Sequence, residues 1–207
     1  SSADGTFTTL AAPDTTPPTV SLTAPVSGAT VAGATVPVSA SASDNVGVLG
    51  VQFLLDGATL GAEDLSSPYG LSWDTTSATN GAHSLSATAR DAAGLSTTSA
   101  AVSVTVDNAA PLLSGISAGG LSATAATIRW TSSELADSQV EYGLTTSYGQ
   151  ASLLDATLLT LHSVALSGLT ASSLYHYRVH SRDAAGNLAS SADGTFTTLA
   201  APDTTPP

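Results

Sequence analysis

The sequence contains no cysteine, no methionine and no lysine in its 207 residues. Without cysteine, the chain can form neither a disulfide nor a thiolate metal site. Without lysine, it cannot form the isopeptide links between lysine and asparagine or aspartate that stiffen some surface fibres. Aromatic residues make up only 5% of the chain, so its cores must be built mostly from small and β-branched side chains.

Positive charge is also scarce. Four arginines stand against 16 acidic residues, which gives a formal net charge of −12. Because binding to a phosphate backbone depends on Lys and Arg, the composition excludes nucleic acid and anionic lipid as partners and leaves metal cations. The sequence has no apolar run of about 18 residues, so we predict no membrane insertion.

The residues that are abundant favour strands. Apolar residues make up 42% of the chain and charged residues only 10%, so Ser and Thr carry much of the hydrophilic share. Thr and Val are strand formers, and no long stretch shows helical periodicity. We therefore predict an all-β fold.

An internal repeat sets the organisation of the chain. Residues 1–18 recur without a single change at residues 190–207. The offset, 190 − 1 = 189 residues, is far longer than the roughly 20 to 50 residues of a solenoid repeat, so each period must hold whole domains. We predict one period of a tandem array whose neighbours in the chain are identical repeats. An enzyme rarely needs identical copies of itself in series, whereas a fibre, stalk or adhesin does.

Alternating apolar residues and turn signals divide the chain into five parts. The first domain shows about seven strand-like runs in about ninety residues, which is the pattern of a β-sandwich. The predicted parts are the last strand of the preceding repeat (1–10), a stiff linker (11–18), a first sandwich (19–106), a second sandwich (107–199) and a linker to the next repeat (200–207).

The second domain carries the most diagnostic stretch. Residues 169–179 read LTASSLYHYRV, and Trp130 lies upstream. This pattern resembles a fibronectin type III domain, in which Tyr175 would be the tyrosine corner. Ala171 stands where that family usually has proline, a departure in the loop that leaves the strand pattern intact.

The first domain carries three short motifs at turn positions. They are Asp14-Thr-Thr-Pro-Pro18, Ser43-Asp-Asn-Val-Gly47 and Arg90-Asp-Ala-Ala-Gly94. With them the domain resembles the bacterial Ig-like domains of secreted and surface proteins. Both resemblances imply repeated spacers, adhesive modules or fibre segments, located outside the cell or on a bacterial cell surface.

Acidic residues occupy three places that an Ig-like sandwich brings to one pole: the start of the first strand, the B–C loop and the F–G loop. Loop oxygens are the ligands that Ca²⁺ accepts, so the pattern predicts a calcium ion at each inter-domain joint. The alternative is that these are ordinary Asx-turn residues. The candidate ligands are Asp14, Asp44, Asn45 and Asp91 in the first domain, and Asp107 with Asn108, Glu134, Asp137 and Asp183 in the second.

A basic stripe lies on one strand of the second domain. Alternation places His176, Arg178, His180 and Arg182 on the face opposite the core tyrosines. In so acidic a chain this stripe could dock another copy laterally. The alternative is that Arg178 pairs across strands with Glu141 and that the histidines are solvated.

The sequence gives no basis for catalysis. The H-E-x-x-H and G-x-x-x-x-G-K-[ST] motifs are missing from it. Residues 115–119 (GISAG) have the spacing of G-x-S-x-G, but that motif requires a strand-to-helix turn and no long stretch here shows helical periodicity. We predict a non-catalytic structural unit of an elongated extracellular fibre, stalk or adhesin that can assemble into a multi-chain filament. The alternative is a spacer or accessory array of a secreted polysaccharide hydrolase, with Tyr69, Tyr142 and Tyr148 as the aromatics that could contact a carbohydrate.

Overall fold

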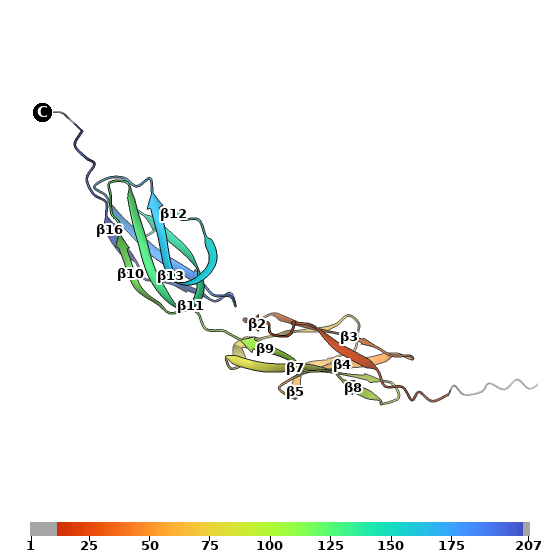
Figure 1. The fold of residues 1–207 in the computed structure, drawn as a ribbon. Coiled ribbons are helices and arrows are strands. Elements are labelled where there is room, and N and C mark those ends of the chain that lie inside the picture. The colour runs from red at the N-terminus through yellow and green to blue at the C-terminus, as the bar shows by residue number, and fades with distance from the viewer. Residues whose placement is uncertain (1–11, 205–207) are drawn as a thin grey trace, which may run out of the picture. The chain divides into compact units, whose positions relative to one another are not determined.

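The computed structural model describes residues 12–204, which fold as two compact units divided between Val106 and Asp107 (Figure 1). The strand predicted for residues 1–10 lies outside the described residues. Residues 12–18 and 198–204 have no regular secondary structure. No helix in the described range could cross a membrane.

Unit 1 is a sandwich of two sheets. The first sheet has the order β1-β3-β6, and the second has the order β2-β9-β7-β4-β5 with β8 added to β7. Asp74 caps a short 3-10 helix, η1 (Thr75–Ser77). The strands are β1 (Thr19–Ala24), β2 (Thr30–Val31), β3 (Val36–Ser43), β4 (Val48–Leu55), β5 (Ala58–Asp64), β6 (Tyr69–Trp73), β7 (Gly81–Asp91), β8 (Ser96–Thr98) and β9 (Val102–Val106).

Alternation along these strands builds the core of unit 1. Every second residue of β3 points inward, and β4 contributes Val51 and Phe53, which are fully buried. Asp-Gly is a strong signal for a two-residue hairpin turn, and Asp56-Gly57 joins β4 to β5 with positive φ at both residues (51° and 82°). The sheets therefore face each other across a shared apolar layer.

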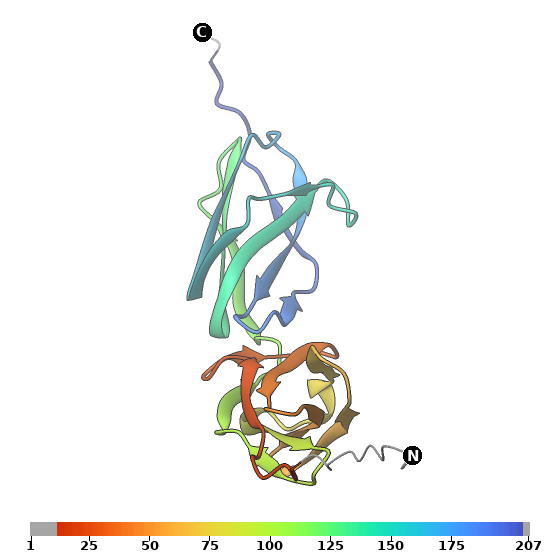
Figure 2. The ribbon, with the colours of Figure 1, turned by 90° about the vertical axis from the view of Figure 1, so that its right-hand side faces the viewer.

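Unit 2 is also a two-layer sandwich (Figure 2). The long strand β11 pairs with β10 along residues 127–132, with β13 between Ala125 and Ser138, and with β14 along residues 139–143, so it passes from one sheet to the other. The strands are β10 (Leu113–Gly119), β11 (Ala125–Gly143), β12 (Gln150–Ala151), β13 (Asp155–Ser167), β14 (Leu174–Arg182), β15 (Leu188–Ser190) and β16 (Gly194–Thr197).

The crossing in β11 corrects one expectation. The sequence placed Glu134 and Asp137 in a B–C loop, but both residues lie within the continuous strand β11. The register of β11 against β13 shifts between Thr131 and Ser138, which marks the bend where the strand changes sheets. The polar residues that suggested a loop occupy this irregular stretch.

Aromatic side chains fix the core of unit 2. Tyr175 is 5% exposed, and its hydroxyl accepts a hydrogen bond from the Thr170 N–H at 3.0 Å, so the predicted tyrosine corner is confirmed. The ring of Tyr175 stacks on Phe196 at a centroid distance of 5.5 Å. Trp130 is buried and its indole N–H donates to Ser181 at 2.9 Å.

A buried histidine in this core was not singled out from the sequence. His162 stacks on Trp130 at 4.8 Å with an interplanar angle of 12°. Its two ring nitrogens lie 2.8 Å from the Ser132 hydroxyl and 2.7 Å from the Ser138 hydroxyl. Burial lowers the pKa of His162, because the charged ring would lose its hydration.

Candidate metal centres

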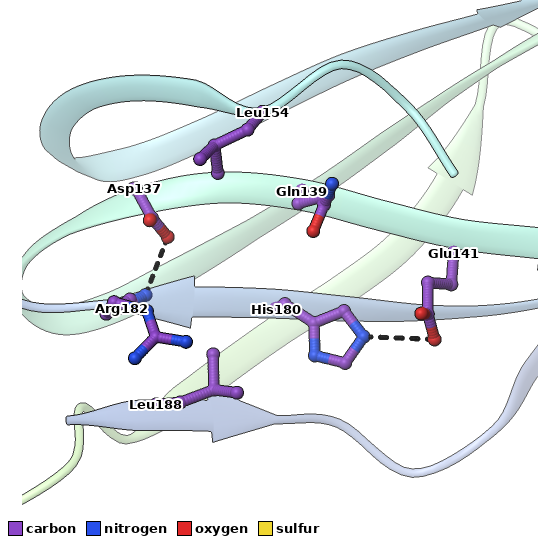
Figure 3. Close-up of a pocket in the computed structure, with 7 residues that line it drawn as sticks. All are labelled: Asp137, Gln139, Glu141, Leu154, His180, Arg182 and Leu188. Atoms are coloured by element: carbon purple, nitrogen blue, oxygen red, sulfur yellow. Dashed lines mark hydrogen bonds and ion pairs between the residues drawn. The ribbon is translucent and has the colours of Figure 1, made fainter. Parts of the chain in front are cut away.

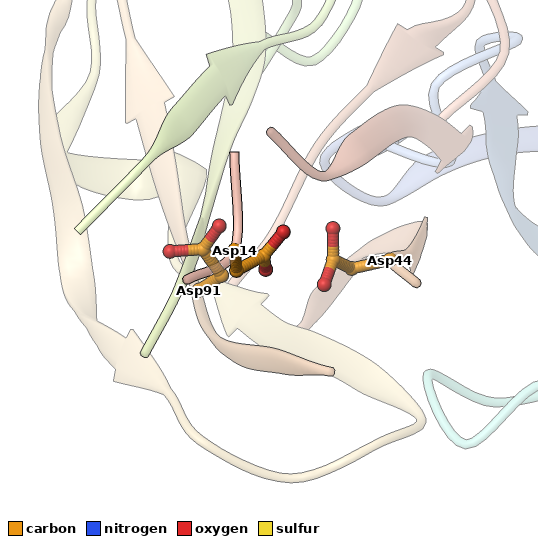
Figure 4. Close-up of side chains that lie close together, drawn as sticks. All are labelled: Asp14, Asp44 and Asp91. Atoms are coloured by element: carbon orange, nitrogen blue, oxygen red, sulfur yellow. The ribbon is translucent and has the colours of Figure 1, made fainter. Parts of the chain in front are cut away.

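Three carboxylates of unit 1 come together, as the sequence predicted. One oxygen from each of Asp14, Asp44 and Asp91 lies within 4.8 Å of the others (Figure 4). Asp14 precedes β1, Asp44 lies between β3 and β4, and Asp91 is the last residue of β7. Three segments that are far apart in the sequence thus place acidic groups at one end of unit 1.

Local hydrogen bonds orient two of these carboxylates. Oδ2 of Asp44 accepts the backbone N–H groups of Val46 and Gly47, each at 2.9 Å. These bonds hold the pKa of Asp44 below its usual range and keep it ionised. Oδ1 of Asp14 accepts from the Thr16 N–H at 3.1 Å and from the Asn45 amide at 3.2 Å. The Asx-turn alternative therefore describes this local structure correctly, but it does not account for the convergence of three carboxylates.

Asp91 is the most deeply buried member of this cluster, at 2% exposure. Its Oδ1 accepts the Leu95 N–H at 2.8 Å, whereas its Oδ2 is buried and has no hydrogen-bond partner within residues 12–204. Oδ1 of Asp44 is in the same situation. A buried carboxylate oxygen without a partner is costly, because it has lost its water and gained nothing in exchange.

The one arginine of unit 1 does not neutralise this cluster. Arg90 is the only arginine before residue 107, and its guanidinium is engaged by Glu63 through two bonds of 2.5 and 2.8 Å. His83, the only histidine of unit 1, lies 2.7 Å from Asp56. The three carboxylates therefore face one another with hydrogen bonds as their main compensation.

Unit 2 repeats the arrangement with different partners. Asp107, Glu134 and Asp183 also bring one oxygen each within 4.8 Å of the others. Burial, followed by the charges of Asp107 and Asp183, raises the pKa of Glu134. Oδ1 of Asp183 accepts the Asn187 N–H at 2.9 Å, and its Oδ2 accepts the Asn187 side-chain amide at 2.9 Å. Both oxygens of this buried carboxylate are thus hydrogen-bonded.

One residue distinguishes the two clusters, and sequence reasoning missed it. The segments Arg90–Gly94 and Arg182–Gly186 have the same five residues, and the next residue is Leu95 in unit 1 and Asn187 in unit 2. Each donates its backbone N–H to the aspartate four residues earlier, but only Asn187 has a side chain that reaches the second oxygen.

The remaining predicted ligands have other contacts. Asp137 does not join its cluster, and its Oδ1 instead accepts the Arg182 N–H at 2.7 Å. Asn45 contacts the first cluster through its hydrogen bond to Asp14. Asn108 follows Asp107 directly and is half-buried.

The basic stripe is paired within unit 2. Arg178 lies 2.6 Å from Glu141 and covers the ring of Tyr148 at 4.8 Å, as the alternative interpretation of the stripe expected. The histidines are not simply solvated, because His176 lies 2.8 Å from Asp193 and His180 lies 2.7 Å from the Ser190 hydroxyl.

The end of the stripe lines a shallow pocket of about 230 Å³ (Figure 3). His180 and Arg182 line it beside Glu141 and Asp137, so acidic groups accompany the basic ones. The Arg182 guanidinium is engaged by the Gly186 carbonyl at 2.9 Å. The pocket therefore offers mixed charge rather than a strongly basic surface.

The fold and these clusters define a class of protein: a tandem pair of Ig-like β-sandwiches, each with an acidic cluster beside its first strand. Residues 18–87, which lie within unit 1, match the model of the bacterial Ig domain family.

The whole chain also resembles part of a larger protein. It is 32% identical over 214 residues to Exoglucanase B of Cellulomonas fimi, in an alignment that covers 99% of this chain and 18% of that protein. The chain thus spans less than a fifth of the length of this relative.

Two solved structures are similar to this chain. The FN1–FN3 domains of chicken CNTN1 match with a TM-score of 0.56 and 13% identity, over 88% of this chain and 66% of that one. The fibronectin(III)-like modules of Clostridium thermocellum CbhA match at 27% identity and a TM-score of 0.39, over 42% of this chain and 94% of that one. The first of these likenesses concerns the fold alone, and it agrees with the predicted all-β tandem sandwich.

Proposed function

We propose that this chain is a non-catalytic spacer unit of an elongated extracellular bacterial protein. The observation that carries the proposal is that the chain enters and leaves each unit at opposite poles. In unit 1, Asp14 at the entry lies beside Asp91 at the end of β7, whereas Val106 at the exit pairs with Gly81 at the start of β7. Entry and exit at opposite poles would let each unit add its full length to the chain.

Unit 2 has the same polarity. Asp107 at the entry clusters with Asp183, which directly follows β14, and Thr197 of the last strand pairs with Leu174 at the start of β14. At about 3.3 Å per strand residue plus end loops, a unit spans roughly 35 to 45 Å. One period of two units would then add roughly 70 to 90 Å of reach.

The repeat and its linker support the same function. The unchanged recurrence of residues 1–18 at residues 190–207 means that consecutive periods are joined in the same way. Pro17-Pro18 stands immediately before β1 and restricts the backbone there, so the linker is short and stiff. Spacing and transmission of tension need this regularity, whereas catalysis does not.

The comparisons support a non-catalytic role outside the cell. Bacterial Ig domains and fibronectin type III modules are typically structural or accessory parts of larger proteins. The three tyrosines that could contact a carbohydrate are poorly placed for it, because Tyr69 is buried, Tyr142 is half-buried and Tyr148 lies under Arg178. A spacer role therefore accounts for the chain better than carbohydrate binding.

Two settings for such a spacer each have an observation in their favour. The unchanged recurrence of residues 1–18 at residues 190–207 favours a fibre, stalk or adhesin, in which copies would pack laterally to form a filament. The basic stripe of unit 2 could take part in this packing only by exchanging its internal partners, such as Glu141, for acidic groups of another copy. The alignment of nearly the whole chain with part of Exoglucanase B favours a spacer array within a secreted polysaccharide hydrolase. We propose the spacer role in both settings. Of the two, we propose the filament before the hydrolase array.

Electron microscopy of the native material, with and without EDTA, tests this proposal. Regular multi-chain fibres would support the filament, and isolated strings of beads that end in a larger globular part would support the hydrolase array. Compact particles without a repeating extended part would contradict the spacer role in both settings.

A further inference from the structure

We propose that Asp14, Asp44 and Asp91 bind a calcium ion that ties the segment before β1 to unit 1. The proposal concerns this cluster alone, and it stands whether or not the chain serves as a spacer. It rests on geometry, on the unpartnered oxygens and on the ligand chemistry.

The geometry suits one cation. Each of the three residues offers one carboxylate oxygen, and these oxygens lie within 4.8 Å of one another. Two oxygens that bind the same Ca²⁺ at about 2.4 Å can be at most about 4.8 Å apart. The three oxygens can therefore reach one ion with small adjustments of side chains that come from loops and strand ends (Figure 4).

The unpartnered oxygens point to a ligand independently of the clustering. Asp91 is 98% buried (2% exposed), and its Oδ2 has no hydrogen-bond partner among the described residues. Oδ1 of Asp44 is buried and unpartnered as well. A cation compensates such oxygens directly. The one arginine of unit 1, Arg90, is already held by Glu63 and is not available for this.

The donor set selects the ion. All three ligands are carboxylate oxygens, with no nitrogen or sulfur donor, so a hard cation is expected. Ca²⁺ accepts six to eight oxygens in flexible geometry, whereas Mg²⁺ requires a near-ideal octahedron. Ligands from three separate segments suit the more tolerant ion. Rotation of the Asn45 amide would offer a further oxygen beside Asp14, and water can complete the shell.

In unit 2, a side-chain amide occupies the role that we propose for the ion in unit 1. There the Asn187 amide donates to the oxygen of Asp183 that corresponds to the unpartnered one in Asp91. It also donates to the Asp107 carbonyl, so it joins two elements of that cluster. The side chain of Leu95 has no polar group and cannot make these hydrogen bonds. In unit 1 the ion would instead connect the aspartate at the end of β7 to the segment before β1. We therefore expect the tighter calcium site in unit 1.

Calorimetric titration of the 207-residue chain with CaCl₂ tests the site directly. We expect binding with a Kd between about 10⁻⁴ and 10⁻³ M, as in extracellular modules. Asp91→Asn should weaken this binding at least tenfold. Asp74→Asn removes the same charge from unit 1 outside the cluster and keeps a capping oxygen, so it should bind like the wild type. No binding by the wild type, or equal losses in both variants, would overturn the proposal.

Thermal melting separates a metal ligand from a merely structural residue. In EDTA, Asp91→Asn should melt at the same temperature as the wild type or higher, because it removes a buried unpartnered charge. In CaCl₂ the order should reverse, since only the wild type gains from the ion. A variant that melts lower than the wild type by the same amount in both solutions would contradict the proposal.

Leu95→Asn provides a second variant that keeps all three carboxylates. It installs the residue that pairs with both oxygens of Asp183 in unit 2, so it should raise the melting temperature in EDTA and weaken calcium binding at least tenfold. Unchanged calcium affinity would contradict the role of the unpartnered oxygen. MgCl₂ at the same concentrations should bind more weakly, and equal binding would contradict the choice of ion.

Discussion

Tyr175→Phe removes a single hydroxyl group from the core of unit 2. The ring can keep its stack on Phe196, so the change deletes the hydrogen bond from the Thr170 N–H and little else. A neutral hydrogen bond contributes about 1 kcal/mol, and because Thr170 is exposed, water can reach the freed N–H. We therefore expect a loss of about 1 kcal/mol in unfolding free energy, or about 4 to 8 °C in the melting temperature of a domain of this size.

Tyr177→Phe is the matched control. Tyr177 lies on the same strand and is also 5% exposed, but its hydroxyl has no hydrogen-bond partner among the described residues. Its loss should change the unfolding free energy by less than about 0.5 kcal/mol.

Urea unfolding in a Trp73→Phe background isolates the signal, because Trp130 is then the only tryptophan and reports on unit 2. Equal losses for Tyr175→Phe and Tyr177→Phe would refute the assignment of the corner hydrogen bond.

Further predictions concern pH, calcium and the basic stripe. Burial holds the pKa of His162 below 6.5, so the unfolded chain binds a proton on this ring more readily than the folded one. Unit 2 should therefore lose stability as pH falls below about 6.5. In urea titrations, His162→Gln should flatten this pH dependence. The hydrogen bond to Asp56 raises the pKa of His83. The contribution of this pair to the unfolding free energy of unit 1 should therefore be complete below about pH 6.5 and decline as pH rises through the higher folded-state pKa. A His83→Gln variant with the same pH dependence as the wild type would exclude this origin. At free Ca²⁺ tenfold above Kd, linkage should add about 1.4 kcal/mol to unit 1, or roughly 6 to 11 °C, and EDTA should remove it. Arg178→Glu should dissociate lateral bundles seen by electron microscopy while leaving unit 2 folded, and bundles that persist would count against the stripe as an interface.

The sequence was sufficient to predict the all-β sandwich fold and the convergence of the three carboxylates of unit 1. Alternation and turn residues such as Asp56-Gly57 are local signals, and the structure follows them. The topology of an Ig-like sandwich determines which loops and strand ends lie at the same pole. The proximity of Asp14, Asp44 and Asp91 could therefore be predicted from the sequence.

The details of the clusters could not be predicted in the same way. Whether Oδ2 of Asp91 has a partner depends on how far one neighbouring side chain reaches, and periodicity carries no such information. The continuous strand β11 was missed because polar residues at Glu134 and Asp137 look like a loop, although the strand only bends there. His162 was missed because a histidine between two serines on other strands is a tertiary contact.

The most direct test of the spacer role is small-angle X-ray scattering of this chain and of a chain lengthened by one 189-residue period. If each unit adds its full length, the maximum dimension should increase by roughly 70 to 90 Å. An increase of less than about 30 Å, no more than the strand length of one unit, would show that the units fold back on one another and would contradict the spacer role.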